Sequence, residues 1–140
     1  MIIEIDEKEI SFGNQKLVYD LYHLDFPHYE KYRAPTVGGV FKNIVFEWVK
    51  ALDSPTLDQP LFLPYAFDDE WVDCLKALEQ CDKVIFKLVR IDENGWAVNF
   101  SDLNEFITSP HKICQESAEI FGEYNKDEIL AALLNARVID

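Results

Sequence analysis

Three side chains near the start of the chain are of the types that do chemistry. His23, Asp25 and His28 place two imidazoles and a carboxylate within a short stretch. Such a set could bind a metal ion or act as an acid–base pair. However, His23 ends a predicted strand and His28 follows Pro27 in a predicted loop, so the spacing fixes no common face. Two interpretations remain open here: a small enzyme or metal-binding protein, and two partly exposed histidines in a contact loop.

The rest of the sequence carries no strong catalytic motif. It has no phosphate-binding loop, no dinucleotide-binding glycine motif, no nucleophile elbow and no zinc-protease motif. Gly38 and Gly39 precede a predicted helix and could approach an anion, but no lysine stands in the phosphate-loop position, so helix geometry explains them better. Cys74, Cys81 and Cys114 have no metal-ligand spacing. We therefore predict no enzymatic activity, no cofactor and no metal.

Net charge gives the strongest hint about partners. The chain has 13 basic and 26 acidic residues, for a formal net charge of −13. Such a charge disfavours binding to nucleic acid and to anionic membranes, because contacts with phosphate need Lys and Arg. It favours encounter with a cationic protein surface, although the same charge also serves solubility alone. If a macromolecular partner exists, we expect a protein domain with a basic surface.

Acidic residues concentrate in two segments of the sequence. Residues 68–82 hold six acids against one base, Lys76, and no lysine or arginine occurs between Asp92 and Pro110. A solvated face is one explanation, and steering of a basic partner is the other. The candidate partner-binding residues from these segments are Asp68, Asp69, Glu70, Trp71, Asp73, Asp92 and Glu93.

A tyrosine-rich segment supplies further candidates. Residues 19–33 interleave aromatic rings with acids. Tyrosine combines a large contact area with a hydroxyl at low entropic cost, and it recurs among interface hot spots. Because some of these rings must serve the core, we choose the irregular excursion after the strand and add Asp25, Tyr29 and Tyr32 as candidate partner-binding residues.

Period-two patterns and turn residues predict several strands. The expected strands span residues 2–6, 9–12, 17–24, 61–65 and 83–91. Residues 92–95 are predicted to form a turn with Gly95 at positive φ, leading back into a partner strand over 96–100. The stretch 112–122 is ambiguous between helix and strand.

Helical periodicity and capping residues predict the helices. A helix over 40–52 has the clearest apolar stripe. A second helix is expected from an N-cap at Asp68 to about Gln80, with Cys74 and Cys81 on one buried face. Asp102 and Glu105 suggest a capping box for a short helix, and Asn125 is expected to cap a last helix through residue 136.

These elements predict one α+β domain over residues 1–140, with a mainly antiparallel sheet packed with helices. The length suffices for a core of its own. The first residues show no signal-peptide pattern, no stretch is long and apolar enough to span a bilayer, and the odd cysteine set suits a reducing compartment. We therefore expect a cytoplasmic protein.

The stretch PLFLPYAFDDEWVDCLKALEQ, Pro60 to Gln80, resembles in layout a strand–acidic turn–Trp–helix element of certain immunity proteins. These proteins belong to bacterial contact-dependent growth inhibition and other polymorphic toxin systems, and they are similarly small, acidic and cysteine-poor. The resemblance implies binding to a cognate toxin domain, usually a nuclease, and its neutralisation by occlusion. A regulatory or assembly subunit with an acidic surface remains an alternative.

Overall fold

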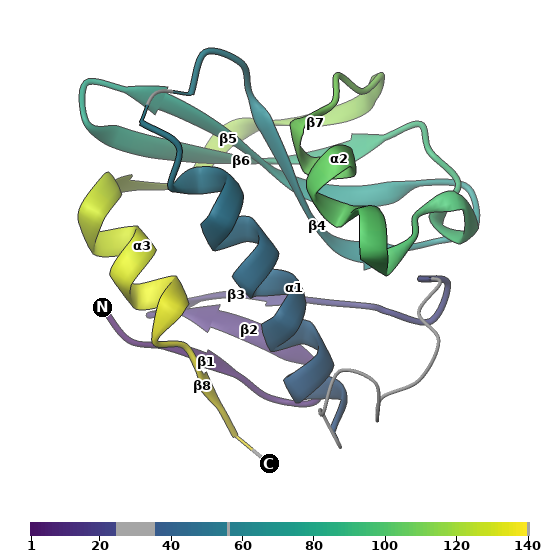
Figure 1. Cartoon of the computed structure of the whole chain (residues 1–140), viewed down its shortest axis with the longest axis horizontal. Coiled ribbons are helices and arrows are strands. Elements are labelled where there is room, and N and C mark those ends of the chain that lie inside the picture. The colour runs from purple at the N-terminus through teal and green to yellow at the C-terminus, as the bar shows by residue number, and fades with distance from the viewer. Residues whose placement is uncertain (25–35, 56, 140) are drawn as a thin grey trace.

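A small sheet holds both ends of the described chain (Figure 1). The structure is a computed structural model, and it describes residues 1–24, 36–55 and 57–139. Three short strands form an antiparallel meander, and the last strand pairs in parallel with the first, in the order β3-β2-β1-β8. The strands are β1 (Ile3–Ile5), β2 (Glu9–Phe12), β3 (Gln15–Val18) and β8 (Arg137–Val138). Gly13, with φ of 64°, forms the β2–β3 turn in a conformation that favours glycine.

A larger antiparallel sheet forms the other half of the molecule, in the order β4-β5-β6-β7. Its strands are β4 (Leu61–Phe67), β5 (Val72–Gln80), β6 (Lys83–Ile91) and β7 (Ile113–Asn125). A single parallel bridge between Asp20 and Ala66 links the two sheets. There the Asp20 N–H donates to the Tyr65 carbonyl (3.0 Å) and the Phe67 N–H donates to the Asp20 carbonyl (2.8 Å).

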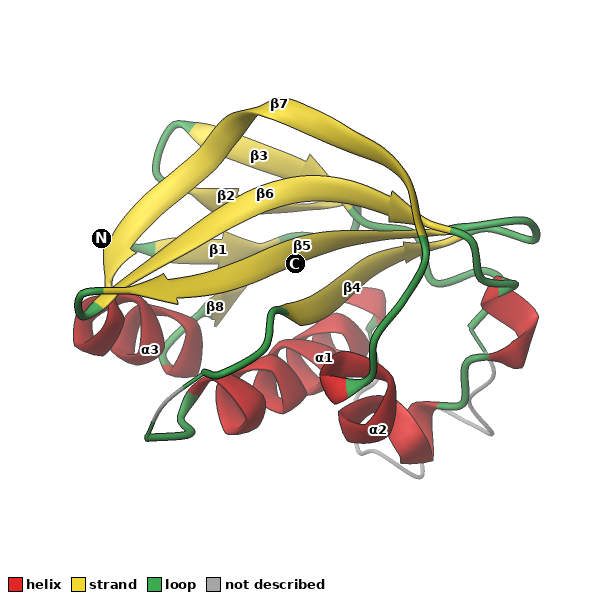
Figure 2. Ribbon diagram, turned by 90° about the horizontal axis from the view of Figure 1, so that it is seen from above, coloured by secondary structure: helices red, strands yellow, loops and turns green. Residues whose placement is uncertain are grey.

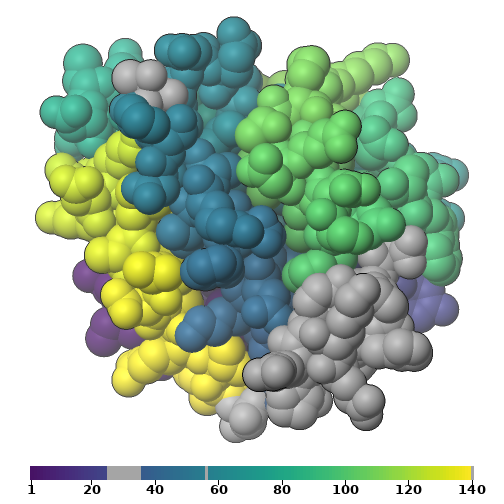
Figure 3. All heavy atoms as spheres, viewed as in Figure 1, coloured from purple at the N-terminus to yellow at the C-terminus, as the bar shows by residue number. Residues whose placement is uncertain are grey.

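The helices lie together on one side of the larger sheet (Figure 2). They are α1 (Val37–Leu52), α2 (Leu103–Thr108) and α3 (Lys126–Leu134), with 3₁₀ turns η2 (Gly95–Ala97) and η3 (Phe100–Asp102) ahead of α2. Figure 3 shows α1 between α2 and α3 on this face of the molecule. The buried Trp48 of α1 donates from Nε1 to the Pro64 carbonyl (3.1 Å), so α1 is fixed to β4 by packing and by a hydrogen bond.

One continuous core joins both sheets and the helices. Phe12 of β2 packs edge-on against Phe86 of β6 and Phe121 of β7, with ring centroids 6.4 and 5.4 Å apart.

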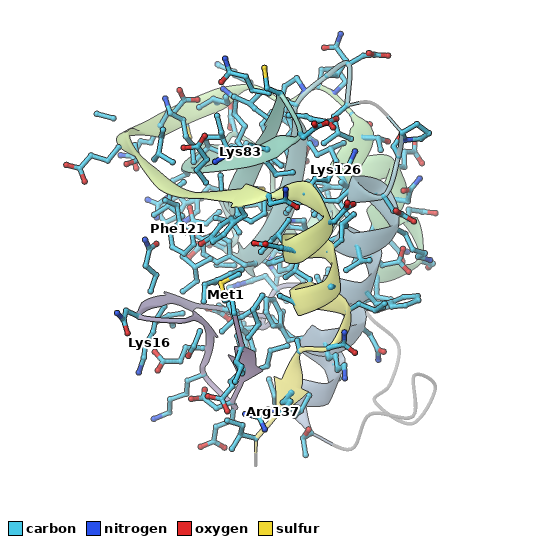
Figure 4. The ribbon with its side chains drawn as sticks, turned by 90° about the vertical axis from the view of Figure 1, so that its left-hand side faces the viewer. Met1, Lys16, Lys83, Phe121, Lys126 and Arg137 are labelled. Carbon is cyan, nitrogen blue, oxygen red and sulfur yellow. The ribbon has the colours of Figure 1, made fainter. Side chains whose placement is uncertain are left out.

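Polar contacts also hold α3 to its neighbours. Lys126, labelled in Figure 4 at the start of α3, donates from Nζ to the Ser54 carbonyl (2.7 Å) and to Glu79 Oε1 (3.1 Å). The predicted α+β class with a mainly antiparallel arrangement is confirmed.

Several predicted elements are confirmed with small changes. The helix over 40–52 begins earlier, at Val37, because the Thr36 hydroxyl accepts from the Gly39 N–H (3.0 Å) and caps it. Asn125 caps α3 by accepting from the N–H groups of Asp127 and Glu128, although the helix ends at Leu134. By contrast, the strand expected over 17–24 is largely wrong, because β3 spans Gln15–Val18 and shares only residues 17 and 18 with it.

The helix predicted from Asp68 to Gln80 is wrong. Val72–Gln80 is β5, a strand between β4 and β6. Its leucines, alanine, lysine and glutamate are good helix formers, but pairing on both sides outweighs this local preference. Consequently Asp68 is no helix N-cap, and Cys74 is buried while Cys81 is exposed in the β5–β6 turn.

The predicted hairpin strand over 96–100 is also wrong, since 3₁₀ turns occupy this region. Gly95 does not have a positive φ. Asp102 makes no side-chain capping bond to α2, so the expected capping box with Glu105 is not formed. The ambiguous stretch 112–122 is part of the strand β7.

Candidate functional site

The two acidic segments predicted from the sequence meet at one end of the larger sheet. Residues 68–71 form the β4–β5 turn, closed by a hydrogen bond from the Asp68 N–H to the Trp71 carbonyl (2.9 Å). The Gly95 N–H donates to the Asp68 carbonyl (2.9 Å) and draws the loop after β6 against this turn. Both turns lie at the right-hand end of the sheet in Figure 1. Acids that are distant in sequence thus become neighbours.

Gly95 is required for this approach. A Cβ atom at residue 95 would collide with the Asp68 carbonyl oxygen. Because that oxygen belongs to the backbone, no rotamer change could relieve the collision. The glycine therefore permits a close backbone contact and does not supply the left-handed turn that the sequence suggested.

An aromatic cluster flanks the acidic turns. The His23 ring lies between the rings of Tyr22 and Trp96. The centroid of the His23 ring is 4.9 Å from the centroid of each neighbouring ring, and the interplanar angles are 78° to Tyr22 and 87° to Trp96. His23 Nδ1 lies within hydrogen-bonding distance of the Phe67 carbonyl oxygen (3.2 Å), which fixes the cluster beside the β4–β5 turn. Tyr22 and Trp96 are 78% and 56% exposed, so both rings are available for contact.

We call this region the acidic–aromatic surface. Its members are Tyr22, His23, Asp68, Asp69, Glu70, Asp92, Glu93 and Trp96.

Most carboxylates of the acidic–aromatic surface have no internal cation. Among the described residues, no ion pair includes Asp68, Asp69, Glu70 or Glu93. Asp92 Oδ2 lies 3.6 Å from Lys112 Nζ, but both side chains are well exposed, so this pair contributes little. The surface therefore presents negative charge that a basic partner could neutralise.

The pKa of the Asp68 carboxyl lies below its ordinary value. The main cause is a hydrogen bond with the Asp69 side chain, and the backbone N–H groups of Asp69 and Glu70 and the nearby His23 add to it. The Asp69 N–H donates to Asp68 Oδ1 (2.8 Å), so this carboxylate also holds the turn. Asp68 is therefore both a turn residue and a stable negative charge.

A groove of about 240 Å³ continues the acidic–aromatic surface towards α2. Three carboxylates line it, those of Glu93, Asp102 and Glu105, and Phe106 contributes an apolar wall. A groove of this kind suits a long cationic side chain, whose methylenes pack on the ring while the charge meets the carboxylates.

Trp71 and Asp73, which the sequence also indicated, serve internal contacts. Asp73 of β5 binds Arg90 of β6 at two points, Nε to Oδ1 (2.8 Å) and Nη2 to Oδ2 (3.2 Å). The Arg90 guanidinium carbon lies 4.2 Å from the centre of the half-buried Trp71 ring. The hydrogen bonds that the guanidinium donates to Asp73 raise the pKa of Arg90. A role of these residues in partner binding stays a prediction.

Other candidates fall outside the described residues. Asp25, Tyr29 and Tyr32 of the proposed contact segment do so, as does His28 of the proposed catalytic or metal-binding set. Within the described ranges, no group of three or more His, Cys, Asp or Glu side chains is placed to hold a metal ion.

Sequence reasoning missed Tyr22 and Trp96 as exposed rings. The sequence predicts Trp96 in a hairpin strand and Tyr22 in the strand over 17–24, whereas neither residue lies in a strand of the structure.

Comparison with protein-family models, with curated proteins and with solved structures finds no match to this chain. No described helix is both long and apolar enough to cross a membrane.

Proposed function

We propose that this protein is an inhibitor of the immunity type, which binds a cognate basic toxin domain and occludes it. We expect the toxin domain to be a nuclease, because nucleases bind phosphate with Lys and Arg and therefore have a basic surface. The protein acts in the cytoplasm, by binding and without catalysis or cofactor. The helical part of the element that residues 60–80 resemble is the strand β5 in this structure, so the uncompensated carboxylates, and not that resemblance, support the class of partner.

One observation carries the proposal. Carboxylates without internal cations lie beside two exposed aromatic rings at one end of the larger sheet. Uncompensated charge of one sign steers a partner of opposite sign and raises the association rate. Aromatic side chains supply the desolvated anchors from which most binding energy comes. The acidic–aromatic surface combines both properties in one place.

The test is binding to a basic toxin domain encoded beside this chain, such as the variable C-terminal domain of a large secreted protein. We expect a complex whose affinity falls as salt rises, because its charges are screened. We also expect the chain to restore growth to cells that express the toxin domain. Growth rescue separates a toxin inhibitor from an acidic assembly subunit, which would bind without protecting the cell.

A matched pair of variants tests the surface itself. The surface variant D69N/E70Q/E93Q removes three negative charges and keeps Asp68, which holds the turn. The control variant D58N/E119Q/E123Q removes three exposed charges elsewhere. We expect association with the toxin domain to slow about tenfold in the surface variant and by less than about threefold in the control. Equal slowing would assign the effect to net charge alone and reject the surface.

A further inference from the structure

The strand β7 bows away from its neighbour β6. Thirteen residues of β7 lie along nine residues of β6. Lys87 pairs with Ile120 and Val89 pairs with Glu116, so Leu88 alone faces three residues of β7, numbered 117–119. Figure 2 shows β7 arched away from β6 between ends that stay close together. Bulges of this kind redirect side chains and often border functional sites.

A pocket of about 460 Å³ lies at this interruption of the pairing. We call it the β6–β7 pocket, and its lining residues are Tyr65, Asp73, Leu88, Val89, Arg90, Gln115, Glu116 and Ser117. Its volume lies in the range of small-molecule sites. None of the residues of the acidic–aromatic surface lines it, so it is a separate site.

Tyr65 brings an unpaired hydroxyl to the pocket. The residue is nine-tenths buried, with 9% of its surface exposed. No hydrogen bond joins its hydroxyl to another of the described residues, yet no fully enclosed polar side-chain atom among them lacks a partner. The hydroxyl is therefore reached from the pocket. Burial, with the nearby Asp73 carboxylate, raises the pKa of Tyr65, so the phenol keeps its proton and can donate.

The carboxylates of the pocket are already engaged. Both oxygens of Asp73 accept from Arg90. Glu116 meets Lys76 through Oε1 (2.9 Å) and Lys87 through Oε2 (3.7 Å). These described pairs hold three cations and two anions, a local excess of positive charge in a chain of net charge −13.

Hydrogen-bond donors remain available in the same place. Arg90 Nη1 takes part in none of the described hydrogen bonds, and the Tyr65 hydroxyl and the Gln115 amide are likewise free to donate. Leu88 and Val89 add apolar wall. A ligand that suits this set has strong acceptor oxygens and an apolar body.

We propose that the β6–β7 pocket binds a carboxylate, which accepts from the Tyr65 hydroxyl and the Arg90 guanidinium while its apolar body packs on Leu88 and Val89. The carboxylate belongs to a small organic acid or to the C-terminus of a peptide. Guanidinium groups match carboxylates geometrically, and a charged acceptor strengthens the tyrosine hydrogen bond. The proposal does not depend on the inhibitor function.

Nuclear magnetic resonance titration of the ¹⁵N-labelled full chain tests the proposal. One arm uses N-acetyl-L-phenylalanine, and a second uses a short uncharged peptide with a free C-terminus. The matching amides, N-acetyl-L-phenylalaninamide and the amidated peptide, serve as controls. We expect an acid to shift the Arg90 Nε and Ser117 amide signals and its amide to leave them in place. The arm that binds more tightly identifies the source of the carboxylate.

Two variants complete the test. Tyr65→Phe removes only the hydroxyl, and we expect it to weaken carboxylate binding about tenfold, the effect of one hydrogen bond to a charged group. Tyr124→Phe removes the hydroxyl of a half-buried tyrosine that does not line the pocket, and it should leave binding unchanged. Equal shifts with acid and amide, or unchanged binding in Tyr65→Phe, would overturn the proposal. Neither result bears on the acidic–aromatic surface, whose residues do not line the pocket.

Discussion

The acidic–aromatic surface and the β6–β7 pocket differ in whether their carboxylates have cationic partners. In the pocket, Asp73 and Glu116 lie within strands, and each carboxylate meets a cation from the neighbouring strand β6, Arg90 and Lys87 respectively. On the surface, Asp69 and Glu70 lie in a turn and have no such neighbour among the described residues. The register places Asp73 and Glu116 near cations of other strands, whereas the turn residues have no such register. In these two regions, cross-strand pairing and not net charge decides which carboxylates are free for a partner.

The largest expected effect concerns the ring that lies beside the free carboxylates. Trp96→Ala should lower affinity for the toxin domain by at least about 2 kcal/mol, because exposed tryptophans serve as interface anchors. The free energy of unfolding should change by less than about 1 kcal/mol, since the indole is largely solvent-exposed. Calorimetric titration and urea unfolding measure the two quantities.

Phe46→Ala is the control for this substitution. Phe46 is 49% exposed on α1, so it is also a large ring at the surface. Its removal should leave toxin affinity unchanged. Equal losses from the two substitutions would show that the aromatic cluster has no special part in binding.

The next effect concerns the engaged carboxylates. Arg90→Ala leaves the Asp73 carboxylate without its cation and removes the stacking on Trp71. We expect the free energy of unfolding to fall by about 1.5 kcal/mol, as for a partly exposed bidentate pair. Lys112→Ala, which breaks the exposed pair with Asp92, should cost less than about 0.5 kcal/mol. Similar losses in urea unfolding would contradict the distinction between the partly buried pair of Asp73 and the exposed pair of Asp92.

The sequence predicted some elements well because their signals are local. The stripe of α1 and the Asn125 cap of α3 depend on residues a few positions apart. The identity of β5 depends on two neighbouring strands, which no local period reveals. The sequence predicted every acid of the acidic–aromatic surface, but their proximity depends on the contact between Gly95 and Asp68, which a single sequence does not reveal.

A smaller effect is expected for Glu79 of β5, a third kind of carboxylate. It accepts hydrogen bonds from the loop before β4 and from the start of α3. The pKa of Glu79 is lowered first by the Leu57 N–H and then by the hydrogen bond from Lys126. A lowered folded-state pKa gives stability that is present above the unfolded value of about 4.3 and is lost as pH falls through the folded value.

Glu79→Gln should therefore lower the free energy of unfolding at pH 7. Between pH 5 and pH 3, the free energy of unfolding of this variant should fall by less than that of the wild type. Urea unfolding across this range measures the difference. Glu123→Gln, at an exposed carboxylate of β7 in no described ion pair, should follow the wild-type curve. If Glu79→Gln also runs parallel to the wild type, the link between this carboxylate and the fold is wrong.

The smallest expected effect concerns the stability of the free surface itself. At low salt, the free energy of unfolding of the surface variant D69N/E70Q/E93Q should exceed that of the wild type by about 0.5 kcal/mol, because like charges held close repel one another. The gain should disappear in about 0.5 M NaCl, where the Debye length is only about 4 Å and exposed charges are largely screened. The control variant D58N/E119Q/E123Q should gain less. A destabilised surface variant would show that these carboxylates support the fold. A gain would mean that the protein keeps them at a cost in stability, and binding a basic partner would then account for their presence.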